Sequence, residues 1–345
     1  MRLKGIGNGW ILWIERTDRR VVKFNPLDKS LTEIGPDFGE GGGKWRCGVL
    51  AKTGCIYCAP AYADHILKIN TNDGTVETLD DVEMSETGRD LWASGALAED
   101  NYIYYMPYRY CALQIMRLNA DNDICSSVGD DLGEQGGKYI GTVVGNDDCV
   151  YGIPHESRRI FKYNPADPDT TSTVGGEEAE EGFSCAGNGV LGGDGYIYAA
   201  NGVGQVLKVD TANNNYAWIG DRIYSGNGLG WGNAIIGVDK CINWPPLCAN
   251  RALKFDPATQ QLPSLVGDDL GERKWKWKGG ALAATDGVSH LVPLKSSPLT
   301  HLSNLLVTTM QNSIQKYPQE LFAEDECNET FYGSAVRKFG IEKVF

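Results

Sequence analysis

Cysteine and histidine are the residue types in this sequence with the most direct capacity for chemistry. Cys55-Ile-Tyr-Cys58 has the spacing of a redox or zinc pair. A zinc site would need a second pair or histidine partners at matching spacing, and the sequence has neither. The four histidines are His65, His155, His290 and His301, and no Ser or Cys motif accompanies them that would indicate a nucleophile with its base. We therefore predict no catalytic residue, no metal site and no cofactor.

Basic residues recur at a nearly constant spacing, and a series of hydrogen-bond donors runs three positions ahead of them. The basic series is Lys23, Lys68, Arg117, Lys162, Lys208, Lys254 and His301. The donor series is Arg20, His65, Gln114, Arg159, Gln205 and Arg251. For the basic series we favour repeated internal ion pairs with acids of nearby loops, and a positive lining for an anionic ligand is the alternative. An Asn or Asp two places beyond most of the basic residues predicts a turn there.

Both series belong to a longer repeat, which predicts the architecture that must position them. A short strand begins at each of seven anchors spaced 45 to 47 residues apart, namely Trp10, Cys55, Tyr102, Cys149, Tyr196, Cys241 and Val288. Each repeat holds four strand-like segments, and the first carries a small residue, such as Gly95, seven places before the anchor. Four short strands per repeat around a ring are typical of a β-propeller, in which the innermost strands crowd toward the axis.

We therefore predict an all-β propeller of about seven four-stranded blades over residues 1–304, with six blades as the alternative. The first repeat lacks a recognisable first strand, so we expect the ring to close through one shared blade. From about residue 305 the pattern changes, and residues 304–317 indicate an amphipathic helix that ends before Pro318. Residues 305–345 are thus predicted to form a short helical C-terminal extension.

In a propeller, the loop after the second strand of a blade shares a face with the connectors between blades. The connectors carry the aromatic residues Trp45, Trp92, Tyr139, Trp231 and Trp275. They also carry the acids Asp37, Asp80, Asp81, Asp130, Asp131, Glu177, Glu178, Asp221, Asp268 and Asp269. Because aromatic plates, donors and carboxylates suit recognition, we predict ligand binding on this face by Arg20, Trp45, His65, Trp92, Arg159, Trp231 and Arg251. The alternative is that the aromatic residues wedge neighbouring blades together and that Asp-Asp-Leu-Gly is turn chemistry.

The cysteines fit a packing role better than a pairing role. Cys55, Cys149 and Cys241 occupy the same repeat column as Tyr102 and Tyr196, which indicates a position that needs bulk. Free buried thiols suit a reducing compartment, although a disulfide between Cys241 and Cys248 stays open. No small-residue cleavage site follows the first apolar run, so we expect an intracellular, cytoplasmic protein.

Composition and short sequence motifs narrow the possible functions of the protein. The formal net charge of -13 argues against a general nucleic-acid binder, and no apolar run reaches the length of a membrane span. Three segments resemble those of uncharacterised β-propeller repeat proteins of diatoms and related algae. They are the motif Gly-Asp-Asp-Leu-Gly (129–133 and 267–271), the segment Lys44-Trp-Arg-Cys-Gly-Val-Leu-Ala51 and the segment Tyr317-Pro-Gln-Glu-Leu321. The resemblance implies a propeller and brings no catalytic residue with it, and residues 289–297 depart from its usual blade.

Two functions follow from these patterns. We favour a non-catalytic binding or scaffold propeller that recognises a protein, peptide or glycan at one face, because near-identical blades lack the unique residues of a catalytic site. The alternative is a metal-dependent hydrolase or lactonase of the calcium propeller type. That chemistry needs inward carboxylates and an Asn near the axis, and only Asn188 and Asn233 are obvious candidates.

Overall fold

The computed structural model describes residues 4–5, 11–13, 19–25, 27–28, 30–40, 44–79, 91–108, 112–133, 137–157, 159–168, 170–175, 184–185, 187–226, 229–271, 276–282 and 289–293. Within these ranges all regular structure is β-strand, arranged in consecutive antiparallel sheets. Six sheets have four strands and one has two. The all-β prediction is therefore confirmed.

The strands follow one another along the chain in the order of their sheets. The first two sheets contain β1 (Lys4–Gly5), β2 (Ile11–Trp13), β3 (Val21–Phe24) and β4 (Leu31–Ile34), then β5 (Trp45–Leu50), β6 (Cys55–Pro60), β7 (Ile66–Asn70) and β8 (Val76–Leu79). The next two contain β9 (Trp92–Leu97), β10 (Tyr102–Pro107), β11 (Ile115–Asn119) and β12 (Ile124–Val128), then β13 (Tyr139–Val144), β14 (Val150–Pro154), β15 (Ile160–Tyr163) and β16 (Thr171–Val174). The last three contain β17 (Val190–Leu191), β18 (Ile197–Ala200), β19 (Val206–Asp210) and β20 (Asn215–Ile219), then β21 (Ile235–Ile236), β22 (Ile242–Trp244), β23 (Ala252–Phe255) and β24 (Ser264–Val266), then β25 (Trp277–Leu282) and β26 (Ser289–Pro293).

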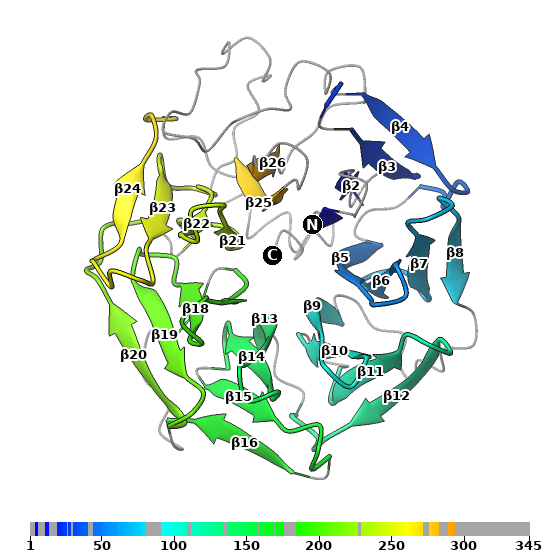
Figure 1. Ribbon diagram of the computed structural model, residues 1–345, viewed down its shortest axis with the longest axis horizontal. Coiled ribbons are helices and arrows are strands. Elements are labelled where there is room, and N and C mark those ends of the chain that lie inside the picture. The colour runs from blue at the N-terminus through cyan, green and yellow to red at the C-terminus, as the bar shows by residue number, and fades with distance from the viewer. Residues whose placement is uncertain are drawn as a thin grey trace, which may run out of the picture.

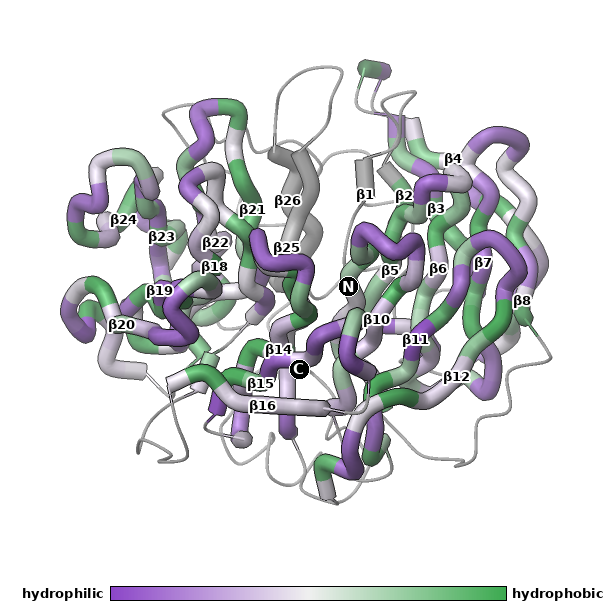
Figure 2. Tube along the Cα trace, turned by 60° about the horizontal axis from the view of Figure 1, so that its bottom comes forward, coloured by the Kyte–Doolittle hydropathy of each residue, from purple (hydrophilic) through white to green (hydrophobic). Residues whose placement is uncertain are grey.

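The sheets stand around a ring as the blades of a β-propeller (Figure 1). In the six four-stranded sheets the first strand lies toward the centre and the fourth strand lies at the rim (Figure 1). Strand β25 contacts β21 on one side and β1 on the other, so the last described strands meet the first. The side view shows apolar residues along the strands and polar residues at many of the turns (Figure 2).

Two details of the first and last repeats bear on the expected ring closure. The first blade does have a first strand, because Lys4 and Gly5 pair with Leu12 and Ile11. All four strands of this blade come from residues 4–34, so it is not the shared blade that the sequence suggested. A two-residue innermost strand is too short to recognise in a sequence. His301 and the predicted C-terminal helix lie outside the described residues.

Local chemistry explains why the strands end where they do. Beyond the third strand, an Asn or Asp side chain accepts a hydrogen bond from the backbone N–H two residues on, as in Leu27 to Asn25 at 3.0 Å and Ala258 to Asp256 at 2.9 Å. These bonds confirm the turn predicted after the basic series. The second strands are buried on both faces because neighbouring blades cover them, as all six residues of β6 show.

The innermost strands pack closely, as the small residues predicted. A Cβ atom on Gly95 would lie 2.5 Å from the ring of Tyr105, which is closer than atoms can approach. In the neighbouring blade the backbone N–H of Thr142 donates to the Ser94 hydroxyl at 2.7 Å, and the Thr142 hydroxyl donates to the Ser94 carbonyl at 3.0 Å. Adjacent blades are thus joined near the axis by hydrogen bonds as well as by packing.

Candidate functional site

The propeller has two distinct faces, defined by which loops reach them. One side of the ring is formed by the loops between the second and third strands and by the connectors between blades, and we call it the connector face. We call the opposite side the turn face. Backbone hydrogen bonds hold the connectors on those loops, from Phe38 to Arg19 at 2.7 Å, from Leu132 to Leu113 at 2.8 Å and from Leu270 to Asn250 at 2.9 Å. All seven predicted ligand-binding residues lie at the connector face.

The basic series lies between the faces and forms internal contacts. Lys68 pairs with Asp123 at 2.6 Å, Lys162 with Asp147 at 2.8 Å and Lys254 with Asp239 at 2.7 Å. Arg117 instead donates to Ser126 and Lys208 to Gln260, and each also lies over a tyrosine ring. The interpretation as repeated internal ion pairs is confirmed for Lys68, Lys162 and Lys254.

A tyrosine column, which the sequence reasoning missed, completes this arrangement. Tyr57, Tyr104, Tyr151 and Tyr198 stand two places after their anchors and lie opposite the basic residue on the next strand. Their hydroxyl groups donate to the carboxylates of Asp123, Asp100, Asp147 and Asp194. Burial, followed by the contact with a carboxylate, raises the pKa of each phenol. The constant Tyr spacing was the available signal.

The tryptophans of the predicted site are buried. The exposed fraction is 6% for Trp45, 9% for Trp92 and 1% for Trp231. The indole N–H of Trp45 donates to the His65 carbonyl at 2.8 Å, and that of Trp231 donates to the Arg251 carbonyl at 2.9 Å. Within the described residues the Trp92 indole N–H has no acceptor. These rings pack the blades, as the alternative interpretation stated, and Trp231 has almost no surface left for a ligand.

Half of the donor series forms hydrogen bonds within its own blade. The side chain of Arg20 donates to the carbonyl of Gly35 at 2.6 Å, that of Gln114 to Gly129 at 2.8 Å and that of Gln205 to Gly220 at 3.3 Å. Each of these glycines follows a fourth strand and has φ between 76° and 89°, a left-handed conformation that favours glycine. The donors therefore cap the ends of the outer strands.

Arg159 and Arg251 behave differently from the other members of the donor series. Both are exposed. Their guanidinium groups make no hydrogen bond or ion pair with any residue in the described ranges, and Arg159 lies near the buried Tyr139. They belong to the fourth and sixth blades, so they do not form one cluster with Arg20 in the first blade. Among the described residues, hydrogen bonds bring together two pairs of predicted residues, Trp45 with His65 and Trp231 with Arg251.

The connectors follow the predicted turn chemistry. The carboxylate of Asp131 accepts a hydrogen bond from the N–H of Gly133 at 2.7 Å, and Asp269 does the same for Gly271 at 2.8 Å. Asp37 and Gly39 repeat the arrangement at 2.8 Å. The acids of Asp-Asp-Leu-Gly thus shape turns, while Asp80, Asp81, Glu177 and Glu178 lie outside the described residues.

Buried or half-buried lysines that precede the first strands are a second feature absent from the sequence prediction. The Lys138 ammonium donates to the Ala112 carbonyl at 3.2 Å, and the Lys276 ammonium donates to the Ala249 carbonyl at 3.0 Å. Each bond joins one blade to the loop of the blade before it. Burial lowers the pKa of Lys276 to about 8. The pairs Lys44-Trp45, Lys138-Tyr139 and Lys276-Trp277 were the visible signal.

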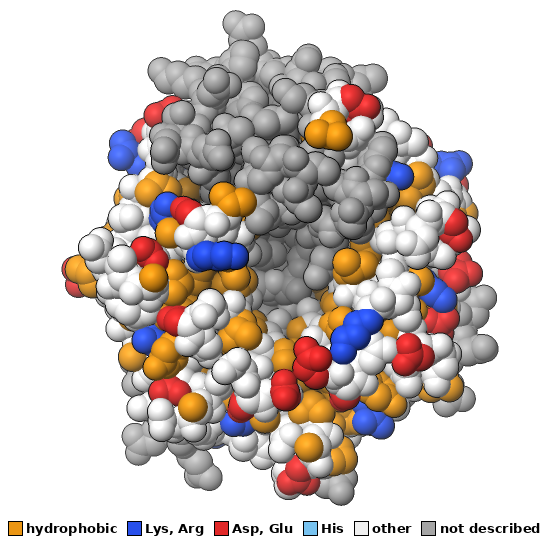
Figure 3. All heavy atoms as spheres, viewed as in Figure 1, with side chains coloured by type: hydrophobic (Ala, Val, Ile, Leu, Met, Phe, Trp, Pro, Cys, Tyr) orange, Lys and Arg blue, Asp and Glu red, His pale blue; other side chains and the backbone are white. Residues whose placement is uncertain are grey.

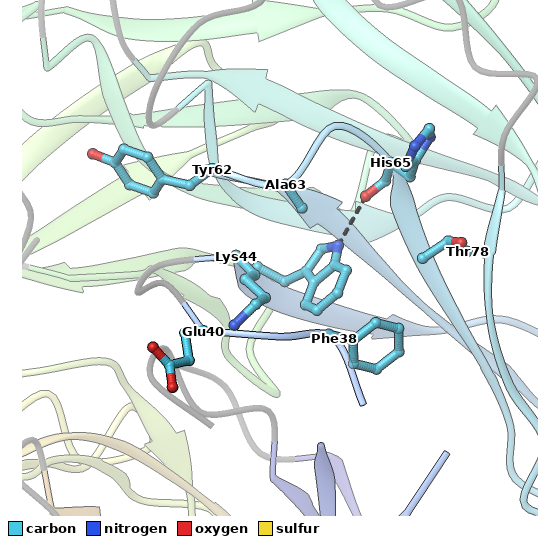
Figure 4. Close-up of a pocket in the computed structure, with 8 residues that line it drawn as sticks. Phe38, Glu40, Lys44, Tyr62, Ala63, His65 and Thr78 are labelled. Atoms are coloured by element: carbon cyan, nitrogen blue, oxygen red, sulfur yellow. Dashed lines mark hydrogen bonds between the residues drawn. The ribbon is translucent and has the colours of Figure 1, made fainter. Parts of the chain in front are cut away.

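A cavity of about 350 Å³ opens on the connector face at the second blade (Figure 4). Its lining residues are Phe38, Glu40, Lys44, Trp45, Tyr62, Ala63, His65 and Thr78. The Phe38 ring meets Trp45 edge-on with centroids 4.9 Å apart. Lys44 extends toward Glu40 (Figure 4), whose carboxylate also lies 3.4 Å from Arg19. Trp45 and His65 are thus the two predicted residues that line a cavity.

The described part of the chain shows the state of its cysteines and whether potential metal ligands cluster. Eight cysteines are free, including Cys55, Cys58, Cys241 and Cys248. Within the same residues no group of three or more His, Cys, Asp and Glu gathers as metal ligands. Asn233 accepts a hydrogen bond from the backbone N–H of Asn188 at 3.1 Å, so its carbonyl oxygen joins two blades.

Comparisons with known proteins establish the fold. No family model matches the chain, and no curated protein matches it. A catalytically inactive virginiamycin B lyase from Staphylococcus aureus, solved with quinupristin, aligns with a TM-score of 0.65 and 11% identity over 85% of this chain and 90% of the lyase. A streptogramin B lyase aligns with a TM-score of 0.64 and 11% identity over 84% of this chain and 89% of its own.

A protein from Lactobacillus plantarum aligns with a TM-score of 0.63 and 17% identity, covering 83% of this chain and 89% of that chain. The chain therefore shares the propeller fold of virginiamycin B lyase-like proteins. At these identities the likeness extends to the fold alone. The described residues contain no helix with the length and hydropathy to cross a membrane.

Proposed function

We propose that this protein is a non-catalytic binding propeller that recognises a protein, peptide or glycan through its connector face. The observation that supports the proposal is the division within the donor series. Arg20, Gln114 and Gln205 cap outer strands, whereas Arg159 and Arg251 keep exposed guanidinium groups that the described blades do not engage. An exposed arginine that no described residue binds is available to anchor a partner.

The surface is compatible with selective recognition. On the one face that it draws, the space-filling view shows described side chains of both charge signs interspersed around the ring (Figure 3). A mixed surface favours a particular partner over nonspecific attraction to a polyanion or a polycation. We place the partner on the connector face, where Arg159, Arg251 and the cavity of the second blade lie.

The test is the double variant Arg159→Ala/Arg251→Ala. Its melting temperature should match that of the parent, because exposed charges contribute about 0–1 kcal/mol each. Recovery of partners from native lysate, measured by pulldown with mass spectrometry, should fall at least several-fold. Lys52→Ala is the matched control, since it removes an exposed charge from the turn face. Lower stability with unaltered partners would show that these arginines serve the fold.

The calcium-dependent hydrolase remains the competing function, and one assay separates it from binding. Purified protein should be analysed for bound metal and tested on esters, lactones and the streptogramin B compounds on which the neighbouring lyases are named to act. Stoichiometric calcium together with turnover would contradict the non-catalytic proposal.

A further inference from the structure

The connector between the fifth and sixth blades departs at one position from a pattern that three other connectors share. Each of the three begins with a left-handed glycine after a fourth strand, followed two places later by an acid and three places later by an apolar residue, in residues 35–38, 129–132 and 267–270. The N–H of the apolar residue donates to the loop of the blade that the connector leaves. The connector that runs from β20 toward β21 starts in the same way, because Gly220 is left-handed and Ile223 donates to Val203 at 2.9 Å (Figure 1). In place of the acid it has Arg222.

The acid of this pattern shapes the turn, and Arg222 does not take over that role. In the three other connectors the carboxylate accepts the N–H of a glycine two places on, at 2.7 or 2.8 Å. A guanidinium group has no acceptor for such a bond. The residue two places beyond Arg222 is Tyr224, whose N–H donates to the Val203 carbonyl at 3.1 Å instead. The Arg222 side chain is exposed and makes no hydrogen bond or ion pair within the described residues.

Apolar and aromatic surface lies next to Arg222. Ile223 is 42% exposed, whereas the residues at its position in the three other connectors are half-buried. The half-buried ring of Tyr224 meets the Trp231 ring edge-on with centroids 5.8 Å apart, and the Trp231 indole N–H donates to the carbonyl of Arg251. Arg222, Ile223, Tyr224 and Arg251 therefore gather on the connector face, and we call them the arginine–isoleucine surface.

This surface carries positive charge in an acidic protein. Arg222 and Arg251 are both exposed, and neither has a hydrogen-bond or ion-pair partner for its guanidinium group within the described residues. With the exposed Asp221 beside them the formal sum is one positive charge, whereas the whole chain has a formal net charge of -13. Because a guanidinium group binds a carboxylate through two parallel hydrogen bonds, the two arginines favour a ligand that supplies carboxylates.

We propose that the arginine–isoleucine surface binds a protein segment that presents carboxylates beside an apolar side chain. The carboxylates pair with Arg222 and Arg251, and the apolar side chain covers Ile223 and the Tyr224 ring. Arginine and tyrosine are residue types enriched among the anchors of protein interfaces. A nucleic acid backbone would engage the arginines but leave the isoleucine uncovered, which favours a protein. This inference rests on the proposed binding function and names the chemistry of the partner at one place on the connector face.

The first experiment selects a random peptide library, displayed on phage, against the immobilised full chain. Enriched peptides should carry Asp or Glu beside Leu, Ile or Phe. A synthetic peptide of the enriched sequence is then titrated with the protein and followed by fluorescence anisotropy. Arg222→Ala and Ile223→Ala should each weaken its Kd about tenfold, as the truncation of an interface anchor does.

The sharpest variant is Arg222→Asp, because it gives this connector the acid that the three others carry. Its melting temperature should match that of the parent, since the same turn position accepts an acid elsewhere in the ring. Binding of the acidic peptide should fall further than in Arg222→Ala, because attraction becomes repulsion. Lys240→Asp is the matched control, since it reverses an exposed charge without a partner in the described residues, on the turn face, and should leave the Kd unchanged.

Four results overturn the inference. The first is enrichment of basic or uncharged peptides, or of no peptide, and the second is a Kd that Arg222→Asp leaves unchanged. The third is tighter binding of an oligothymidylate than of the acidic peptide, which would assign the surface to a nucleic acid. The fourth is self-association of the parent that Arg222→Asp abolishes, which would assign it to a second copy of the chain. The Arg159→Ala/Arg251→Ala pulldown measures the broader function with partners from lysate, so it can succeed where this surface fails.

Discussion

At the scale of single residues, the second and fourth blades each hold a tyrosine and a lysine that contact the same carboxylate. In the fourth blade Asp147 binds Lys162 at 2.8 Å and the Tyr151 hydroxyl at 2.8 Å. In the second blade Thr53 stands where other blades have an acid, and Asp123 of the next blade supplies the carboxylate to Lys68 and Tyr57. The contact persists although its acid comes from a different turn, which indicates a structural role.

We predict that Asp147→Asn destabilises the protein by about 1–3 kcal/mol near neutral pH, because it leaves a largely buried ammonium without its charge partner. Burial opposes ionisation of Asp147, but hydrogen bonds from Lys162 and Tyr151 outweigh it and lower the pKa of the carboxyl. A lowered folded-state pKa contributes stability above the unfolded value of about 3.9, and that stability is lost as the pH falls through the folded-state pKa.

Urea unfolding of parent and variant at neutral and acid pH tests this expectation. The difference between the two proteins should shrink as the pH is lowered through that range. Asp148→Asn is the matched control, since it removes a neighbouring charge that no lysine contacts in the described structure. A pH-independent difference would mean that Asp147 acts through packing alone.

At the scale of the element, the first strand of each blade is set by how closely neighbouring blades approach. Gly95 in β9 has no room for a methyl group, since its Cβ would meet Tyr105 at 2.5 Å and Val49 at 3.1 Å. The same column holds Thr142 in β13, where hydrogen bonds to Ser94 join the strands instead. A small residue at Gly95 is therefore required first by Tyr105 on the second strand of the same blade and then by Val49 of the neighbouring blade.

We predict that Gly95→Ala destabilises the protein by about 1–3 kcal/mol, because the added methyl group overpacks against Tyr105 of the same blade and Val49 of the second blade. Gly193→Ala is the control, as a Cβ there would meet nothing within 4 Å and its φ is not in the left-handed range. Thermal unfolding of both variants provides the measurement. Equal melting temperatures for the two would contradict the close approach.

At the scale of the whole molecule, the ring depends on contacts between its two ends. Strand β25 contacts both β21 and β1, which brings residues from the start and the end of the described chain together. Because each blade buries its faces against its neighbours, removal of a blade exposes two apolar surfaces.

A truncation that ends near residue 225 should therefore be insoluble or molten. Loss of β21 through β26 would uncover the neighbours of the missing blades, and the remaining five sheets could not close the ring. Circular dichroism and size-exclusion chromatography measure the result. A monomeric fragment that unfolds cooperatively would require an open array in place of the closed ring.

The sequence by itself determined the repeat length, the four strands of each blade, the turns after the third strands and the ion pairs of Lys68, Lys162 and Lys254. These features involve residues that recur at a fixed place in each repeat, so their periodicity is visible without coordinates. Only the tertiary structure decided that Trp45, Trp92 and Trp231 are buried, that Arg20 caps Gly35, and that a cavity opens beside Trp45. Exposure and cavities depend on how side chains of neighbouring blades fill the space between them, and no spacing within one repeat records that packing.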